Sequence, residues 1–273
     1  MRGASRASLA DAKDRLAALA TRTSGSASAS ELASELFAVV GVLDSQPAVR
    51  RALADPASAR SARTGLAQAL FGSRVSSDTV ELVSSVASSE WAESIDLADA
   101  IEQLAVEALV AEADRAGQLD DLEDDLFRFG RLVGSQAELR AALSNPFAPA
   151  NAKQDLVTAL LGGKVIPHTI QLVTQAALHS RGRSLDRSLE EYARLAAEYR
   201  ERLVAEVRVA SELSAAQRDR LAASLAQAYG HQVHLNIVLD PGVIGGMVIR
   251  IRGEQIDGSV ATRLAAIRRR LTT

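Results

Sequence analysis

The chain has 273 residues, which suggests about two domains at the usual ~150 residues each. Its residues are 47% hydrophobic but only 3% aromatic, so the interior must consist largely of Ala, Leu and Val, which favours closely packed helices. The absence of cysteine excludes disulfides, thiolate metal sites and cysteine nucleophiles, and it fits a reducing cytoplasmic setting.

The charge of the chain argues against nucleic-acid binding through phosphate neutralisation. Its formal net charge is −3, and its only lysines are Lys13, Lys153 and Lys164. No window approaches the ~18 continuous apolar residues that a membrane span needs, and we see no secretory signal at the N-terminus. We therefore expect any membrane association to go through a partner.

Comparing the chain with itself reveals an internal duplication. Gln46 matches Gln136, 90 residues farther along the chain, and no gap interrupts this register. The matched pairs include Arg50/Arg140, Leu53/Leu143, Pro56/Pro146, Leu66/Leu156, Leu70/Leu160, Gly72/Gly162 and Leu82/Leu172. Helical periodicity alone would not keep proline, glycine and leucine in one register for so long. The sequence therefore predicts a duplicated domain, with residues 1–100 as the first copy and 101–203 as the second.

Each copy is expected to be a helical bundle, because apolar residues recur at helical spacing throughout it. In the second copy, Gly117, Gly134 and the pair Gly162-Gly163 are expected to end helices. Its first helix is expected at about 101–116 and its fifth at about 169–178.

Residues 204–273 are predicted to form a small α+β domain in the order strand, helix, strand, strand, helix. The strands are expected where apolar residues alternate, at 204–209, 233–239 and 247–251. Ser214 to Gln217 reads as a capping box at the start of the intervening helix. After a short return at Ile256, the last helix is expected at 260–271. The predicted fold class is thus mainly α, with two tandem helical bundles followed by a small α+β domain.

The residues that resemble catalytic or metal-binding motifs have plainer interpretations. His231 and His234 would point to opposite faces of a strand, so we interpret them as surface histidines. The acidic run from Asp120 to Asp125 lacks calcium-loop spacing and favours a helix N-terminus instead. Gly162-Gly163-Lys164 is an incomplete phosphate loop. We therefore predict no catalytic residue, no cofactor and no metal site.

Two features of the sequence leave alternatives open. Arg181, Arg183 and Arg187 form a basic loop that is either a partner contact or a solvated loop. Trp91 aligns with Arg181 and is either packed against its own bundle or an interface anchor.

The C-terminal region carries the residues that point to a family. A strand, Asp-Pro, Gly-Gly, a second strand, Asp-Gly-Ser and an amphipathic helix follow one another in this order. The residues are Leu239, Pro241, Gly245, Gly246, Asp257, Gly258 and Ser259. This combination resembles the signature of the ATP synthase delta subunit family, bacterial relatives of the oligomycin sensitivity-conferral protein. The resemblance covers about residues 101–271, and the first helical copy is an addition to the family pattern.

The resemblance implies a non-catalytic stator subunit in the peripheral stalk of an F-type ATP synthase, at the cytoplasmic face of the cell membrane. It implies that a helical bundle binds N-terminal segments of alpha subunits, and that the C-terminal domain binds the end of subunit b. This linkage would resist rotor torque during proton-driven ATP synthesis.

In the family, the alpha segment lies in a groove between the first and fifth helices of the bundle. The equivalent pair in the first copy is 8–20 with 79–88. We expect the second copy to be closer to the family arrangement, because it directly precedes the C-terminal domain. The implied interface residues are Val106, Leu109, Ile170, Val173 and Thr174.

Three other readings of the sequence remain. The runner-up is a free-standing helical adaptor or regulatory protein that recruits other partners. An enzyme is a more distant alternative, because no nucleophile, base and oxyanion donor are assembled. The C-terminal hairpin could also belong to an unrelated α+β domain.

Overall fold

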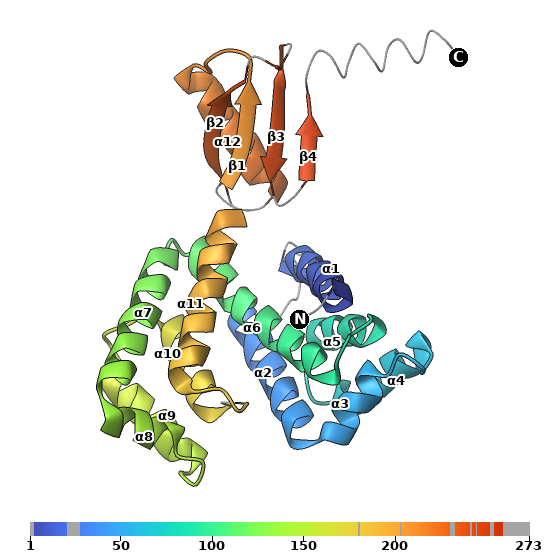
Figure 1. Cartoon of the computed structure of the whole chain (residues 1–273), viewed down its shortest axis with the longest axis vertical. Helices are drawn as coiled ribbons and strands as arrows, with labels where there is room; N and C mark the ends of the chain where they lie inside the picture. The colour runs from blue at the N-terminus through green and yellow to red at the C-terminus, as the bar shows by residue number, and fades with distance from the viewer. Residues whose placement is uncertain are drawn as a thin grey trace. The chain divides into compact units, whose positions relative to one another are not determined.

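The structure is a computed structural model that describes residues 3–20, 28–179, 181–202, 204–229, 233–240, 242–243, 245–251 and 254–258. Within these residues it contains twelve helices and four strands, which confirms a mainly α fold with a small α+β region near the C-terminus (Figure 1). The contacts divide the chain into two compact units, Met1–Ala196 and Ala197–Thr273. The domain boundaries expected at residues 100 and 203 stay predictions.

The first unit is built from helices. They are α1 (Gly3–Ala20), α2 (Ala29–Ser45), α3 (Pro47–Ala54), α4 (Arg60–Phe71), α5 (Ser77–Ser88), α6 (Ser94–Arg115), α7 (Leu119–Ser135), α8 (Ala137–Ser144), α9 (Ala150–Leu161), α10 (Pro167–Leu178) and the start of α11 (Leu185–Arg202). Each of the helices α7 to α10 begins and ends 90 residues after its counterpart among α2 to α5. The predicted repeat is thus visible in the helix boundaries.

The fifth helix of each copy is capped in the same way at its N-terminus. Glu35 of α2 accepts hydrogen bonds from the Ser76 backbone N–H at 2.9 Å and from the hydroxyls of Ser76 and Thr79 at the start of α5. Asp125, the equivalent residue of α7, accepts from the Ile166 N–H at 3.3 Å and the Thr169 hydroxyl at 3.2 Å at the start of α10. A carboxylate at a helix N-terminus satisfies free N–H groups and complements the helix dipole.

The C-terminal end of this helix is also capped equivalently in both copies. Arg63 donates to the carbonyls of Ser88 and Ser89 at the end of α5, at 3.3 and 2.6 Å. Lys153, its counterpart, donates to the carbonyl of Ala177 at the end of α10 at 3.0 Å. Cations at this end satisfy free carbonyls. The duplication therefore preserves the polar contacts that fix the fifth helix.

Helix α6 belongs to both copies. It aligns with α11 as the last helix of the first copy, and it precedes α7 as the first helix of the second. It begins at Ser94, seven residues before the expected 101, and crosses the expected boundary between the copies. Almost every residue from Leu97 to Val110 is buried, because helices of both copies pack around α6. The two copies therefore overlap at α6, whereas the repeat in the sequence predicts consecutive copies.

None of the helices in the described part of the chain is, by itself, long and apolar enough to cross a membrane. Only α2 and α3 together reach that length and composition, and they are bent by 106° where they meet.

The second unit contains β1 (Val204–Val209), α12 (Ala215–Tyr229), β2 (His234–Leu239), β3 (Met247–Ile251) and β4 (Glu254–Asp257). The strand order is β2-β1-β3-β4, with β1 parallel to β2 and antiparallel to β3, and β3 antiparallel to β4. Its core contains inward residues of β1 and β3, Leu225 of α12 and Val233 just before β2: Ala205, Val207, Val209, Leu225, Val233, Ile249 and Ile251.

The predicted capping box begins α12. The Ser214 N–H donates to the Gln217 side chain at 2.8 Å, and the Gln217 N–H donates to the Ser214 hydroxyl at 3.3 Å. Asp257 ends β4. The helix expected at 260–271 lies outside the described residues.

Candidate functional site

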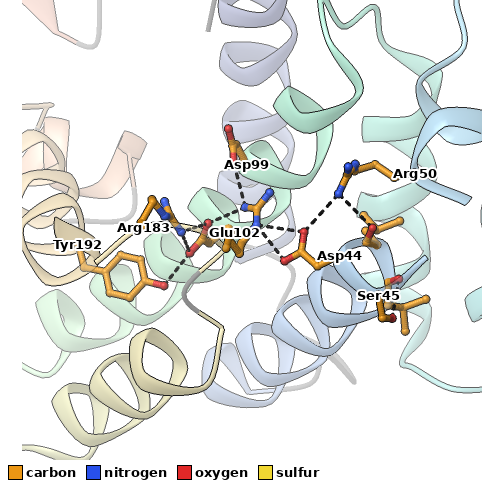
Figure 2. Close-up of polar contacts among 10 residues, drawn as sticks. Asp44, Ser45, Arg50, Asp99, Glu102, Arg183 and Tyr192 are labelled. Carbon is orange, nitrogen blue, oxygen red and sulfur yellow. Dashed lines mark hydrogen bonds and ion pairs between the residues drawn. The ribbon is translucent and has the colours of Figure 1, made fainter. Parts of the chain in front are cut away.

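The most polar buried region of the first unit is a cluster of ionised side chains where the two copies meet (Figure 2). Asp44 comes from the end of α2, Asp99 and Glu102 come from α6, and Arg181 and Arg183 come from the loop between α10 and α11. Tyr192 of α11 and Arg50 of α3 complete it. We call these seven residues the junction cluster.

The contacts of Arg181 bridge the two copies. Its Nε lies 2.9 Å from Asp44 Oδ2 on α2. Its Nη1 lies 2.8 Å from Asp99 Oδ1 and 2.8 Å from Glu102 Oε2 on α6. One guanidinium of the second copy thus binds α2 of the first copy and the shared helix α6.

Glu102 is the central acceptor of the cluster. Arg183 Nη2 lies 2.5 and 2.6 Å from its two carboxylate oxygens, and the Tyr192 hydroxyl donates to Oε1 at 2.7 Å. Arg50 Nη1 lies 3.6 Å from Asp44 Oδ1 at the edge of the cluster. Three arginines therefore face three carboxylates, and the cluster is balanced in charge.

Burial makes these contacts strong and costly to break. The side chains of Glu102 and Arg181 are only 3% and 5% exposed. Burial alone would lower the pKa of Arg181, but the carboxylates of Asp99, Glu102 and Asp44 raise that pKa above its ordinary value. Burial raises the pKa of Tyr192 well above the usual value, and Glu102 adds to this shift, so the hydroxyl stays a donor. Removing one partner of such a group leaves an uncompensated buried charge.

The backbone at the junction cluster is unusual. Arg181 has φ 51°, the only positive φ of a non-glycine residue in the described part of the chain, and Gly182 follows with φ 75°. Residues other than glycine pay for this left-handed conformation with strain, which the surrounding contacts must offset. The loop is therefore shaped to bring Arg181 and Arg183 onto α6.

The basic loop was interpreted as either a partner contact or a solvated loop, but two of its arginines form ion pairs within the chain. Arg181 and Arg183 pair inside the chain, whereas Arg187 is exposed. Trp91, left open by the sequence, is packed: it is 5% exposed, and its Nε1 donates to the Val86 carbonyl at 2.9 Å. The carboxylates of the cluster give no signal in the sequence, because Asp44, Asp99 and Glu102 look like ordinary charges of amphipathic helices.

The residues predicted for an alpha-subunit interface fall into two groups. Val106 and Leu109 of α6 and Val173 of α10 are 0% exposed, so they form the core beneath any contact. Ile170 and Thr174, four residues apart on α10, keep part of their side chains exposed. Only this second pair is accessible in the chain as it stands.

The C-terminal signature is partly described. Gly245 and Gly246 have φ 67° and 79°, a conformation that glycine adopts without strain, and they lead directly into β3. The Gly258 N–H donates to the Met247 carbonyl at 2.9 Å, next to Asp257 at the end of β4. Pro241 and Ser259 lie outside the described residues. Gly245 and Gly246 thus allow the backbone conformation of the connection that enters β3.

Among the described residues, no three His, Asp or Glu side chains are grouped so that they could hold a metal ion. His168, partly buried in the first turn of α10, has its Nε2 3.4 Å from Glu112 Oε2 on α6. His231 lies outside the described part of the chain.

Comparison with known proteins places the chain in a family. The family model described as ATP synthase delta (OSCP) subunit matches residues 101–271, more than half of the chain. ATP synthase subunit delta of Streptomyces avermitilis is 48% identical over 271 residues, covering 99% of this chain and 98% of that protein. The subunit delta proteins of Streptomyces griseus and Thermobifida fusca are 46% and 45% identical, each covering 99% of both chains.

A chain from the cryo-EM structure of the Toxoplasma gondii mitochondrial ATP synthase hexamer is 22% identical, covers 62% of this chain and 95% of its own length, and superposes with a TM-score of 0.29. That superposition is too loose to support an argument. The identification depends on the relatives, whose similarity extends over both helical copies and the C-terminal unit. The chain therefore belongs to the ATP synthase delta (OSCP) subunit family.

Proposed function

We propose that this chain is a peripheral-stalk stator that links the alpha/beta catalytic head of the F-type ATP synthase to subunit b. As a member of the delta family it is a structural subunit of the membrane-associated complex, and catalysis belongs to other subunits. The linkage would hold the head against rotor torque during proton-driven ATP synthesis. Its place would be the cytoplasmic face of the cell membrane, where only the complex connects it to the bilayer.

The observation that best supports this role is the junction cluster. A stator transmits force without yielding, so its parts must not move independently. The shared helix α6 and the buried pairs of Arg181 and Arg183 tie the two helical copies together. Because interiors are close-packed and resist deformation, such a unit is suited to carry a load.

We assign the alpha-subunit contact to α10. Ile170 and Thr174 lie one turn apart with part of their side chains exposed, above the buried Val173. An amphipathic N-terminal segment of an alpha subunit could lay its apolar face on this pair, in the helix-in-groove mode. Subunit b would bind the second compact unit, which has a sheet and core of its own.

The test is formation of a ternary complex. The full chain is mixed with an alpha N-terminal peptide and the soluble end of subunit b, and the masses of the products are measured by native mass spectrometry. The proposal requires one species that contains all three components. Binding of neither component, or mutually exclusive binding, would contradict a linking role and favour a free-standing adaptor.

A further inference from the structure

A polar stripe along α10 and its C-cap does not face solvent. Gln171 and Gln175 of α10 are four residues apart and so share one face of the helix, and His179 follows four residues later as the C-cap residue. Gln175 is only 7% exposed, and Gln171 and His179 are partly buried. Polar side chains at this spacing usually mark a solvated face. Another element must therefore cover the stripe.

Hydrogen bonds at the start of the stripe identify α2 as that element. The Ser30 hydroxyl donates to the Gln171 side-chain oxygen at 2.9 Å. The Gln171 amide nitrogen donates in return to the Ser30 carbonyl at 3.1 Å and to the Ser34 hydroxyl at 2.7 Å. The oxygen and the nitrogen of the Gln171 side-chain amide are thus both hydrogen-bonded to residues of α2.

Contacts at the other end of α10 show that α2 lies close to the second copy there as well. A Cβ added to Gly41 of α2 would lie 3.4 Å from Cε1 of His179, so glycine leaves room for the imidazole. One turn later, Asp44 pairs with Arg181 at 2.9 Å. Three successive points of α2 therefore contact three successive points of the second copy.

Comparison of the two copies shows that this face of α2 is specialised. The equivalent helix of the second copy, α7, has the same core face but a charged, solvent-exposed stripe at the aligned positions. Phe37 is 5% exposed on α2, whereas its counterpart Phe127 is 61% exposed on α7. The aligned pairs are Ser30/Asp120, Ser34/Asp124, Phe37/Phe127, Gly41/Arg131 and Asp44/Gly134. At three of these pairs a small residue of α2, Ser30, Ser34 or Gly41, aligns with an exposed charged residue of α7.

We propose that α2 is a built-in partner helix of the second copy, seated over the helix pair α6 and α10. Besides contacting α10, α2 packs along α6, and α6 contacts α10. The groove between the first and fifth helices of the second copy is then filled from within the chain. The extra copy thus supplies both a second bundle and the helix that closes this groove.

The position of α2 restricts where on α10 an external partner can bind, a conclusion that rests on the proposed function. The stripe of Gln171, Gln175 and His179 is taken by α2, so an alpha segment is left with the adjacent flank of α10. Ile170 and Thr174 lie on that flank, offset by one residue from the covered stripe. The alpha segment and α2 would then bind side by side without competing.

Cross-linking tests the seat of α2 directly in the full chain. The chain has no cysteine, so Ser34→Cys and Gln171→Cys introduce the only two thiols. A short bismaleimide should join them within one molecule, and adding an excess of alpha N-terminal peptide should leave the yield unchanged. Failure to cross-link, or a yield that falls as the peptide binds, would overturn the proposal.

A glycine substitution provides the matched comparison. Gly41→Leu places a side chain against His179 and should release α2, so the cross-link should be lost and amide exchange in α10 should accelerate about tenfold or more. A Cβ added to the exposed Gly65 of α4 meets no atom within 4 Å, so Gly65→Leu should leave both readouts unchanged. Equal behaviour of the two variants would contradict the proposal.

A second variant covers the case in which Gly41→Leu unfolds the chain. Ser34→Asp installs the residue that α7 carries at the aligned exposed position, Asp124, and should fold. Tested in the exchange experiment, it should accelerate α10 while α4 keeps its protection, and unchanged exchange in α10 would count against the proposal. None of these readouts requires a bound partner. Loss of alpha binding with an intact cross-link would therefore refute only the proposed function.

Discussion

Trp91 and Arg181 occupy equivalent positions of the two helical copies, 90 residues apart, and both side chains are 5% exposed. The indole of Trp91 is packed within the first copy, where its Nε1 donates to the Val86 carbonyl. At the aligned position of the second copy, the guanidinium of Arg181 pairs with Asp44, Asp99 and Glu102. The first copy thus has an apolar side chain with contacts in its own bundle at this position, and the second copy has a charged side chain that pairs with α2 of the first copy.

Breaking the junction cluster should destabilise the first unit severely. Glu102→Gln leaves Arg181 and Arg183 without their central carboxylate, so we expect a loss of about 3–5 kcal/mol in the free energy of unfolding. Urea denaturation monitored by circular dichroism measures it. As a control, Arg128→Ala removes the exposed Asp124–Arg128 pair and should cost about 0.5 kcal/mol or less. Similar losses in both variants would show that burial does not strengthen the cluster.

The stability of the first unit should fall as the pH drops below neutrality. Burial lowers the pKa of His179 from its ordinary 6.5, with Arg181 and Lys153 in support and Asp44 and Glu102 opposing. The unfolded chain then takes up a proton that the folded chain refuses, so stability is full above pH 6.5 and declines as the pH falls from there to the folded pKa.

Urea denaturation of wild type and His179→Asn between pH 8 and pH 5.5 checks this dependence. The free energy of unfolding of the variant should fall less over this pH range than that of the wild type. Burial alone would raise the pKa of Glu35, but hydrogen bonds from Ser76 and Thr79 together bring that pKa below its ordinary 4.5, so the stability that Glu35 contributes is lost only below pH 4.5. Identical slopes for wild type and His179→Asn would exclude the histidine as the cause.

Alpha-subunit binding should depend on α10 more than on α5. Ile170→Asp places a charge on the partly exposed flank and should weaken binding of an alpha N-terminal peptide about tenfold or more, because the charge would be desolvated on docking. Val80→Asp makes the same change at the aligned position of the first copy, which is also partly exposed, and should have a smaller effect. Isothermal titration calorimetry on full chains measures both. A larger loss in Val80→Asp would move the site to the first copy.

The glycine pair before β3 should be intolerant of side chains. Gly245→Val or Gly246→Val forces a β-branched residue to φ 67° or 79°, which we expect to cost about 1–3 kcal/mol. The loss should fall on the second unit and on binding of subunit b, while the helical unit keeps its melting temperature. Calorimetric melting and b binding together check this, and an unchanged profile would mean that the backbone relaxes freely.

The local pattern of the sequence was enough to predict most of the fold. Alternation placed β1 and β3, the capping box at Ser214 placed the start of α12, and the 90-residue offset predicted matching helices in the two copies. These features depend on short-range periodicity and on turn residues. The dual role of α6 was missed, because a helix that packs on all sides carries no stripe that marks a boundary.

The candidate site was predicted far less well, because its contacts are long-range. Arg181 and Glu102 are 79 residues apart, and nothing near either residue indicates the pairing. The sequence does contain one signal for the site, which is the difference between the two copies at aligned positions. Gly41 aligns with Arg131 and Trp91 aligns with Arg181, so the charge differs between the copies at these positions although their cores agree. Such divergence marks the faces on which the copies meet.

The most direct test of the stator role is coupling in membranes whose ATP synthase lacks this subunit. We predict that adding the full chain restores ATP-driven proton pumping, measured by quenching of a pH-sensitive dye, without increasing the rate of ATP hydrolysis per head. Binding of the chain to these membranes with hydrolysis still uncoupled from pumping would contradict the account.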